Sequence, residues 1–423
     1  MKKILVLLIC MMACIIISCK ESEEVVAVKE KITFRITWKA YSGRGEAIQK
    51  IVETFNLSQK DYMIETISGD ENLEEIKELM STDRVDVFVL PYRYVQLLGD
   101  EGYLSSFSKE DISDAEMISD GLFDLSEVNE IYYGIPWVSH SMALIYNKDL
   151  LAEAGVDANS IVDRRSFESA LQVIEEMTDA NGIGLVGANH NDVSWMVNQF
   201  IYGNGGRLIE NNQVAINTEQ SRYALQYYRD TLSKYAQETW LEDTGAEVMA
   251  YFRNEDIAFE VQGLWGITDI WRNDNPFEVG VLSLDKIGAN SEVGPMMLSY
   301  GKTISDEKRE VINSFIEYMI SEEAQVAIMK GEFSPERNEY YPFRLPVRQD
   351  ILESEAFEPY QVFNVFITSY GITSIDVPTP KWMIIKETLY APNLNRLMKR
   401  EITIDEFFNI IKTEGDKILK GEE

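Results

Sequence analysis

The chain has 423 residues, of which 45% are apolar, so it is long enough and apolar enough to form more than one globular domain. It carries 71 acidic and 39 basic residues, which gives a formal net charge of −32 at pH 7. A surface this negative repels nucleic acid and anionic lipid headgroups, so the composition argues against nucleic acid as a partner.

The first 19 residues have the pattern of a secretion signal. Two lysines precede an unbroken apolar run, residues 4–17, which is shorter than the roughly 20 residues that span a bilayer. The run ends at Ser18-Cys19, and this ending resembles the lipobox of bacterial lipoproteins, in which the cysteine is diacylated and becomes the new N-terminus. We therefore expect residues 1–19 to form a lipoprotein signal peptide that ends at lipidated Cys19. The alternative is a plain signal peptide with an incidental cysteine.

The next segment, residues 20–30, is charged and weakly patterned, so we expect a flexible tether. Beyond it, strand and helix patterns alternate, and the last strand is a nearly continuous apolar run that ends at Pro91. The expected elements are a strand over 32–38, a helix over 48–55, a strand over 62–67, a helix over 73–80 and a strand over 85–90. This order predicts an α/β doubly wound sheet, with its last strand covered on both faces.

The same alternation returns later in the chain. Residues 142–146 and 183–186 read as strands, and the expected helices are 167–177, 194–202, 218–236 and 306–321. Thr403 and Glu406 have the spacing of a capping box for a last helix. Because no linker or composition change separates two domains, we expect two lobes that are interleaved by several chain crossings.

Most catalytic motifs are missing from the sequence. Only His140 and His190 occur, which excludes a His-rich metal site, and no HExxH, GxSxG, P-loop or GxGxxG motif is present. Paired carboxylates remain open, but nothing in the spacing selects one pair among 71 acids. We therefore expect a protein that is not an enzyme and that holds neither a cofactor nor a metal.

Aromatic residues stand at loop positions next to the predicted strands. In open α/β sheets, ligands lie at the carboxyl ends of the strands. Aromatic rings beside a few Asn, Asp, Arg and His groups suit a ligand with apolar faces and polar edges, such as a sugar. The alternative is that each tryptophan belongs to the core. The residues concerned are Trp38, the Pro91–Tyr94 segment, Trp137, Trp195 and Trp265.

Six segments in chain order resemble the family 1 extracellular solute-binding proteins, the carbohydrate-binding lipoproteins of bacterial ABC importers. The strongest match is IYYGIPWVSHSMALIYNKDLLAEAGVD at 131–157, which is similar to the family's "L-x-Y-N-K-D-L" block. The others are DVFVLPYRYVQLLGDEGYLSSF (86–107), FIYGNGGRLI (200–209), FRNEDIAFEVQGLWG (252–266), ISDEKREVINSFIEYMISEEAQVAIMK (304–330) and YPFRLPVRQDIL (341–352).

The resemblance implies an α/β, two-lobed periplasmic-binding-protein-like fold, with hinge crossings and a ligand cleft between the lobes. The expected lobe 1 comprises residues 31–140 and 300–345, and lobe 2 comprises 143–297 and 350–423. The implied function is an extracytoplasmic lipoprotein, monomeric and attached to the cell membrane only through its lipid. It would capture a sugar or oligosaccharide and deliver it to ABC transporter permease subunits.

The resemblance also implies ligand-binding roles for residues at matched positions: Arg93, Tyr94, His140, Trp195, Trp265 and Trp382. Trp38 and Trp137 are added from their location alone. His140 and Arg93 depart from the acids often found in sugar-specific relatives, which leaves open a partly acidic saccharide as the ligand.

Two other functions compete with sugar capture. A ferric or other metal-binding importer subunit often uses neighbouring tyrosines, and this chain has three such pairs: Tyr132-Tyr133, Tyr227-Tyr228 and Tyr340-Tyr341. The surrounding patterns favour packing roles for these tyrosines. A ligand-sensing co-receptor is the other alternative.

Overall fold

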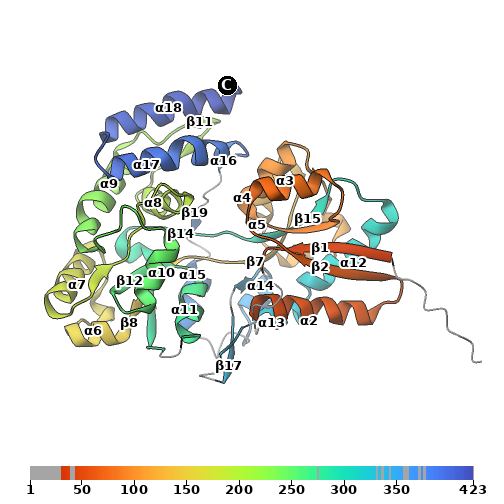
Figure 1. Cartoon of the computed structure of the whole chain (residues 1–423), viewed down its shortest axis with the longest axis horizontal. Coiled ribbons are helices and arrows are strands. Elements are labelled where there is room, and N and C mark those ends of the chain that lie inside the picture. Colours follow the sequence, from red (N-terminus) through yellow and green to blue (C-terminus); the bar gives the residue numbers. More distant parts are fainter. Residues whose placement is uncertain are drawn as a thin grey trace, which may run out of the picture.

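Two β-sheets, each covered by helices, divide the molecule into two lobes that lie side by side (Figure 1). The computed structural model describes residues 30–38, 43–273, 276–329, 332–334, 338–342, 344–355, 362–369, 373–374 and 378–422. The two-lobed α/β fold expected from the sequence is confirmed. The signal peptide with Cys19, and residues 20–29 of the tether, lie outside the described residues. None of the helices that the structure describes has the length and apolar character needed to cross a bilayer.

The first sheet forms the lobe on the right of Figure 1, in the strand order β18-β7-β15-β3-β1-β2, with β4 beside β15. Strands β1, β2 and β3 run parallel, and β15 is antiparallel to β3 and β7. All five residues of β3 are buried, which explains its uninterrupted apolar sequence. The strand bounds are β1 (Glu30–Ile36), β2 (Tyr62–Ser68), β3 (Val87–Pro91), β4 (Leu104–Ser105), β7 (Ile135–Ser139), β15 (Met296–Gly301) and β18 (Leu345–Pro346). The helices are α2 (Gly43–Ser58), α3 (Leu73–Ser81), α4 (Tyr92–Asp100), α5 (Asp120–Phe123), α12 (Asp306–Ile320), α13 (Glu322–Met329) and α14 (Gln349–Leu352).

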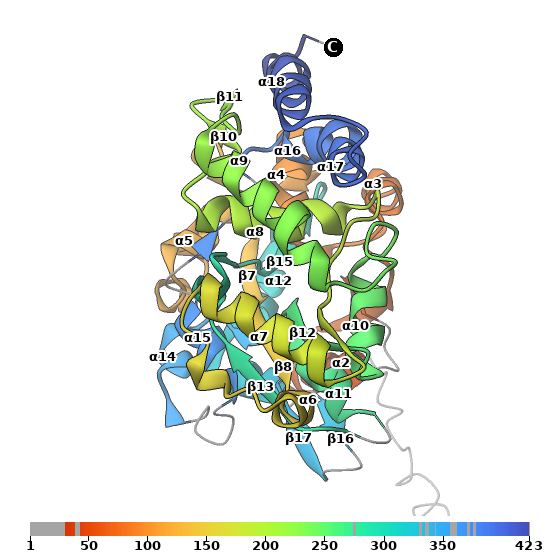
Figure 2. The ribbon, with the colours of Figure 1, turned by 90° about the vertical axis from the view of Figure 1, so that its left-hand side faces the viewer.

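The second sheet has the strand order β13-β8-β12-β9, and Figure 2 looks onto its lobe. Its strands are β8 (Ala143–Asn147), β9 (Asn181–Ile183), β12 (Ile257–Gln262) and β13 (Val279–Leu282). The helices are α6 (Lys148–Ala154), α7 (Arg164–Met177), α8 (Asn191–Gly203), α9 (Glu219–Gln226), α10 (Gly245–Arg253), α11 (Leu264–Trp271), α15 (Asn364–Ser369), α16 (Trp382–Ile385), α17 (Ala391–Met398) and α18 (Ile404–Lys420). The capping box predicted at Thr403 and Glu406 is confirmed at the start of α18.

Short strand pairs complete the fold. They are β5 (Glu127–Val128) with β6 (Ile131–Tyr132), β10 (Ile209–Glu210) with β11 (Gln213–Val214), β14 (Ser291–Glu292) with β19 (Thr373–Ser374), and β16 (Glu332–Ser334) with β17 (Glu339–Tyr341). The helix expected over 218–236 is α9 followed by a π-helical turn, Tyr227–Thr231, and a 3-10 turn, Leu232–Tyr235.

The chain passes between the sheets after β7, after β13 and after β18. The pairing of strands moves two of the expected lobe boundaries. Met296 pairs with Pro91 in the first sheet. The chain therefore enters the first lobe at residue 296, four residues before the expected boundary at 300. Helix α14 packs beside β18 in the first lobe, and α15 packs beside β8 in the second, so the last passage lies between these two helices.

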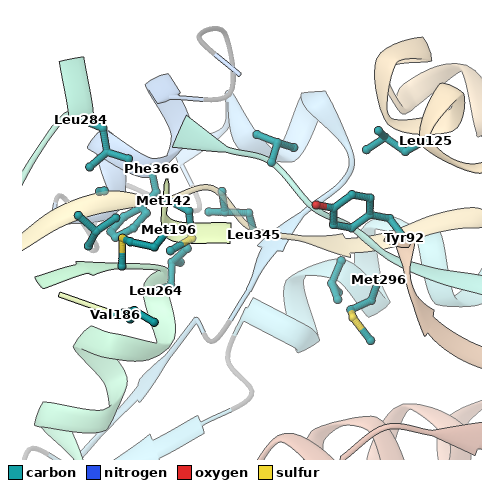
Figure 3. Close-up of a cluster of buried hydrophobic side chains, with 14 of the residues drawn as sticks. Tyr92, Leu125, Met142, Val186, Met196, Leu264, Leu284, Met296, Leu345 and Phe366 are labelled. Atoms are coloured by element: carbon teal, nitrogen blue, oxygen red, sulfur yellow. The ribbon is translucent and has the colours of Figure 1, made fainter. Parts of the chain in front are cut away.

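Apolar packing continues from one lobe into the other along these passages (Figure 3). Met142 and Leu264 lie on the side of the second lobe, and Met296 and Tyr92 lie on the side of the first. Each of these side chains is at most 5% exposed. The passages therefore run through one continuous buried region that joins the two lobes.

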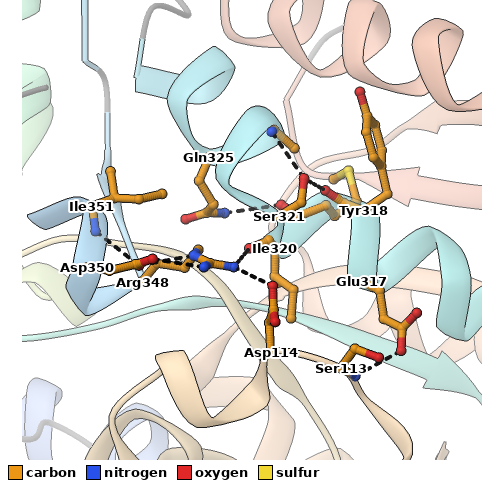
Figure 4. A network of polar contacts seen from close by, with 12 residues as sticks. Ser113, Asp114, Glu317, Tyr318, Ile320, Ser321, Gln325, Arg348, Asp350 and Ile351 are labelled. Carbon is orange, nitrogen blue, oxygen red and sulfur yellow. Dashed lines mark hydrogen bonds and ion pairs between the residues drawn. The ribbon is translucent and has the colours of Figure 1, made fainter. Parts of the chain in front are cut away.

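A polar network fixes the chain just after β18 (Figure 4). The guanidinium of Arg348, which is 5% exposed, donates to Asp114 at 2.8 Å and to both carboxylate oxygens of Asp350 at 3.0 and 2.8 Å. The backbone N–H of Val347 donates to Gln325 at 3.0 Å. This network holds the chain between β18 and α14 against the rest of the first lobe, and Arg344, which precedes β18, reaches the cavity described next.

Candidate functional site

A cavity of about 550 Å³ lies between the lobes and takes its walls from both. The first lobe contributes Glu71, the Pro91–Tyr94 segment, Met296 and Arg344. The passages contribute His140, Glu292, Gly294 and Pro295. The second lobe contributes the His190–Asp192 segment, Trp195, Gly245, Ala246, Met249, Gln262, Trp265 and Lys386.

Five of the residues predicted from the sequence line this cavity: Arg93, Tyr94, His140, Trp195 and Trp265. The structure does not bring the other three to it. Trp137 lies in the fully buried strand β7 and is 0% exposed, and Trp382 is 1% exposed and packs on Tyr390 at 5.1 Å. Trp38 is half-buried, with its ring 6.2 Å from that of Trp137. We therefore correct the assignment of Trp137 and Trp382, whose burial makes them core residues.

Trp265 is the second residue of α11, which follows the buried strand β12 after Gly263, and its ring is held on several sides. The ring of His140 meets it edge-to-face, with centroids 5.2 Å apart and an interplanar angle of 84°. The guanidinium of Arg344 lies over the indole, 4.2 Å from its centroid. A Cβ at position 263 would lie 2.2 Å from the ring, so the close approach of backbone and indole requires Gly263. The indole is therefore a fixed platform that carries Arg344.

His140 and Glu292 face each other across two passages, with Nε2 and Oε2 3.9 Å apart. The hydroxyl of Tyr92 donates to the other carboxylate oxygen of Glu292. Burial lowers the pKa of His140, the nearby charge of Arg344 adds to this effect, and Glu292 opposes it. Burial would raise the pKa of Glu292, but His140 and Tyr92 hold it below its usual value. The two groups therefore shift each other's pKa and titrate as a pair.

Arg93 and Glu71 form the wall on the first lobe. The guanidinium of Arg93 is hydrogen-bonded to the Glu71 carboxylate and lies 5.0 Å from the ring centroid of Tyr94. The Tyr94 hydroxyl donates to the backbone carbonyl of Glu71 at 3.2 Å. Burial disfavours the charge on Arg93, but Glu71 more than offsets this and raises the pKa, so the guanidinium stays charged.

His190 and Asp192 connect the N-terminal ends of α8 and α10 at the wall of the cavity that the second lobe forms. The Nδ1 atom of His190 lies 3.2 Å from the Asp192 carboxylate, and this hydrogen bond raises the pKa of His190 although burial opposes it. The Asp192 carboxylate also accepts a hydrogen bond of 2.9 Å from the backbone N–H of Gly245 at the start of α10. The beginnings of α8 and α10 are thereby fixed side by side at the cavity.

Several cavity residues were missed from the sequence. Arg344 lies inside the segment 341–352 that resembles the family, so this resemblance could have identified it as a cavity residue. The sequence analysis assigned it no ligand-binding role. Lys386 is a lysine that is only 2% exposed, and no sequence pattern marks it. Gln262, which is 3% exposed, lies inside the matched segment 252–266, whereas no sequence pattern marks Glu292, which is 4% exposed.

The two tyrosine pairs whose side chains the structure describes do not line the cavity. Tyr227 and Tyr228 are 5% and 0% exposed in the second lobe, and burial raises the pKa of both. Tyr132 and Tyr133 are half-buried and lie away from the cavity lining, and the side chains of the third pair lie outside the described residues. In the part of the chain that the structure describes, no cluster of three His, Cys, Asp or Glu residues could hold a metal ion.

Comparison with known proteins adds a family and a fold. The family model for bacterial extracellular solute-binding proteins matches residues 50–356. The GacH receptor of Streptomyces glaucescens, solved unliganded and with acarbose, has a TM-score of 0.78 at 20% identity, covering 93% of this chain and 99% of that chain. Maltose-bound MalE3 of T. maritima has a TM-score of 0.75 at 18% identity, covering 93% and 100%. The maltose-maltodextrin binding protein of Alicyclobacillus acidocaldarius has a TM-score of 0.72 at 16% identity, covering 92% and 100%.

Proposed function

Because this chain belongs to the bacterial extracellular solute-binding proteins, we propose that it captures a sugar or oligosaccharide and delivers it to the permease of an ABC importer. The observation that carries the proposal is the cavity between the lobes. It sets the indoles of Trp195 and Trp265 beside the polar side chains of His140, Gln262 and Glu292. Rings suit the C–H faces of a pyranose, and these polar groups suit its hydroxyl edges. Proteins of the same fold bind maltose and acarbose.

The proposal includes a hinged closure of the two lobes around the ligand. Lobe 1 would comprise the chain up to β7 together with β15 through α14, and lobe 2 would comprise the rest, with the hinge in the passages between them. A ligand shifts this equilibrium only if it binds the closed form more tightly, which it does by contacting both lobes. The family consists of binding proteins, and we propose that this chain releases its ligand chemically unchanged, as a monomer.

A glycan panel should identify a saccharide that raises the thermal unfolding midpoint. At a concentration of about 100 times its Kd, such a ligand stabilises the folded state by about 2.7 kcal/mol. Small-angle scattering at the same saturation should then show a smaller radius of gyration. A saccharide that stabilises the protein while leaving the radius unchanged would contradict the hinged closure, and no stabilisation by any saccharide would contradict the sugar assignment.

We also propose that Cys19 anchors the mature chain to the membrane through lipid. In cell fractionation, the wild-type protein should pellet with membranes after a salt and carbonate wash, and Cys19→Ala should move it to the soluble fraction. Cys14→Ala is the matched control, because this cysteine lies within the same apolar segment and should leave the protein in the pellet. If Cys19→Ala still pellets after the wash, the lipoprotein assignment fails.

A further inference from the structure

Four side chains that line the cavity form a row from the first lobe to the second: Tyr92, Glu292, His140 and Trp265. The hydroxyl of Tyr92, in α4, donates to one carboxylate oxygen of Glu292, in β14. The other oxygen of Glu292 lies 3.9 Å from Nε2 of His140, whose ring meets the indole of Trp265 edge-to-face. Glu292 and His140 belong to different passages, so the row joins the lobes through two of the passages.

The backbone of the two passages holds Glu292 and His140 opposite each other. The N–H of Gly294 donates to the carbonyl of His140 at 3.3 Å, and an antiparallel β-bridge joins the residues that follow Glu292 and His140. A Cβ at position 294 would lie 2.8 Å from the His140 ring and would also meet the ring of Tyr92, so this close packing requires glycine. The imidazole and the carboxylate are therefore placed by the backbone of the passages.

One carboxylate oxygen of Glu292 lacks a donor. The residue is 4% exposed, and its Oε2 atom has no hydrogen-bond partner among the described residues. The 3.9 Å that separates Oε2 from Nε2 of His140 is too long for a hydrogen bond, and a buried acceptor without a donor is costly. An imidazolium carries a positive charge and an N–H on both ring nitrogens, so protonated His140 is a donor suited to this oxygen. Uptake of a proton by His140 therefore satisfies Glu292.

The charged and titratable groups that face this pair come from both lobes. They are Tyr92 and Arg93 of α4, Arg344 before β18 and Lys386 after α16. Burial lowers the pKa of His140, Glu292 raises it, and the two arginines lower it further. Burial raises the pKa of Glu292, whereas His140, the tyrosine hydroxyl and the lysine lower it. Glu292 is therefore the group that favours the imidazolium, against burial and two guanidinium charges.

A saccharide in the cavity would act on the same imidazole. His140 lines the cavity, and its side chain is 15% exposed. A bound saccharide replaces the water at this ring by uncharged groups, and the loss of water disfavours the imidazolium. A sugar hydroxyl can also donate to a neutral imidazole, which has one acceptor nitrogen, but not to an imidazolium. Both effects favour the neutral ring in the complex.

We propose that a bound saccharide and a proton on His140 exclude each other, and that Glu292 is the positioning residue that holds this proton in the ligand-free protein. This inference rests on the proposed sugar-binding function. Because His140 is more basic in the ligand-free protein than in the complex, binding releases a proton. Affinity is therefore greatest above the His140 pKa of the ligand-free protein, and it falls as the pH drops through that value. Each unit by which binding lowers the pKa makes the affinity at low pH about tenfold weaker than at high pH.

NMR of the histidine side chains measures this proton directly, on the full mature chain made soluble by Cys19→Ala and purified without a histidine tag. The chain has only two histidines, so His190→Gln leaves one imidazole signal and assigns it to His140. The probes are maltose, cellobiose, lactose and mannobiose, together with any saccharide that the glycan panel identifies. A probe that binds should lower the midpoint of the His140 titration by about one pH unit. By calorimetry, its affinity should be about three- to tenfold weaker at about pH 5 than at about pH 8.

Glu292→Gln should remove this pH dependence, whatever the affinity of the variant at high pH, because an amide has no negative charge to favour the imidazolium. Glu260→Gln is the matched control. Glu260 is an acid that is only 1% exposed and does not line the cavity, so the pH dependence should persist in this variant. It should also persist in His190→Gln, which separates His140 from the other histidine at the cavity. Unfolding midpoints show whether any of these substitutions disturbs the fold.

The other outcomes separate this inference from the function on which it rests. If a saccharide binds and the His140 midpoint stays the same or rises, the inference is overturned and sugar capture stands. The same holds if His140 does not titrate between about pH 5 and pH 8 in the ligand-free protein, since there is then no proton to release. If Glu292→Gln keeps the pH dependence, Glu292 does not hold the proton and the inference is again overturned. If no saccharide binds, the proposed function itself fails.

Discussion

Replacing Trp265 with alanine should weaken binding of the cognate sugar about 100-fold, a loss of about 3 kcal/mol. The large effect is expected because the indole supports two other cavity residues. Arg344 lies on its face and His140 on its edge, so alanine removes the platform that orients both groups. Trp265→Phe should recover part of the affinity, since a smaller ring still offers a surface for the guanidinium.

Trp240→Ala is the matched control for that experiment. Trp240 is a half-buried tryptophan of the same lobe whose ring lies 6.3 Å from Tyr228, and it does not line the cavity. Both alanine variants should lower the unfolding midpoint of the ligand-free protein, but only Trp265→Ala should reduce affinity by calorimetry. If Trp265→Ala destabilises the protein and leaves affinity intact, Trp265 is a core residue and the centre of the proposed site is lost.

The part of the fold that the sequence predicted best is the part with a simple burial pattern. Strand β3 is buried on both faces, so its apolar run was unambiguous, and the capping box at Thr403 depends only on local hydrogen bonds. The passages between lobes were harder to place. Their ends depend on which distant strand they join, such as the pairing of Met296 with Pro91, and local patterns do not record this.

The site shows the same division. Three cavity residues come within a few positions of the ends of buried strands: Arg93, Tyr94 and Trp265. Their position after these strands was enough to predict that they line the site. Trp137 lies within a strand that is buried throughout. The sequence alone does not show whether a tryptophan near a strand end packs in the core or faces a cleft. Lys386 comes from the C-terminal part of the chain and reaches the cavity only through packing of the second lobe, which a linear pattern cannot reveal.

A second large effect is expected at Glu260, an acid buried in β12 behind the helix that carries Trp265. Its side chain is 1% exposed, and its Oε2 has no hydrogen-bond partner among the described residues. A Cβ at Gly266 of α11 would lie 2.8 Å from the other carboxylate oxygen, so the carboxyl group packs directly on that helix. Burial raises the pKa of Glu260 well above its usual range, Asp269 adds to the rise, and Arg253 opposes it.

This raised pKa fixes the sign of the pH dependence. The folded protein keeps Glu260 protonated at pH values where the unfolded chain has already lost the proton. The contribution of this group is therefore fully present below the unfolded pKa of about 4.3, and it is lost as the pH rises through the folded pKa. Above both values, each unit of the shift costs about 1.4 kcal/mol of stability. An amide of the same shape carries no such cost, so Glu260→Gln should stabilise the protein at about pH 8 and lose this advantage toward about pH 4.

Denaturant unfolding of the two proteins across this pH range measures the difference directly. Glu238→Gln is the control, because it makes the same change from acid to amide at an exposed position. It should leave stability nearly unchanged, since isolated surface charges contribute little. The sugar affinity of Glu260→Gln should equal that of the wild type, because Glu260 lies behind α11 and does not line the cavity. A variant that is less stable than the wild type at about pH 8 would instead mean that Glu260 is ionised in the folded state and paired with a cation such as Arg253.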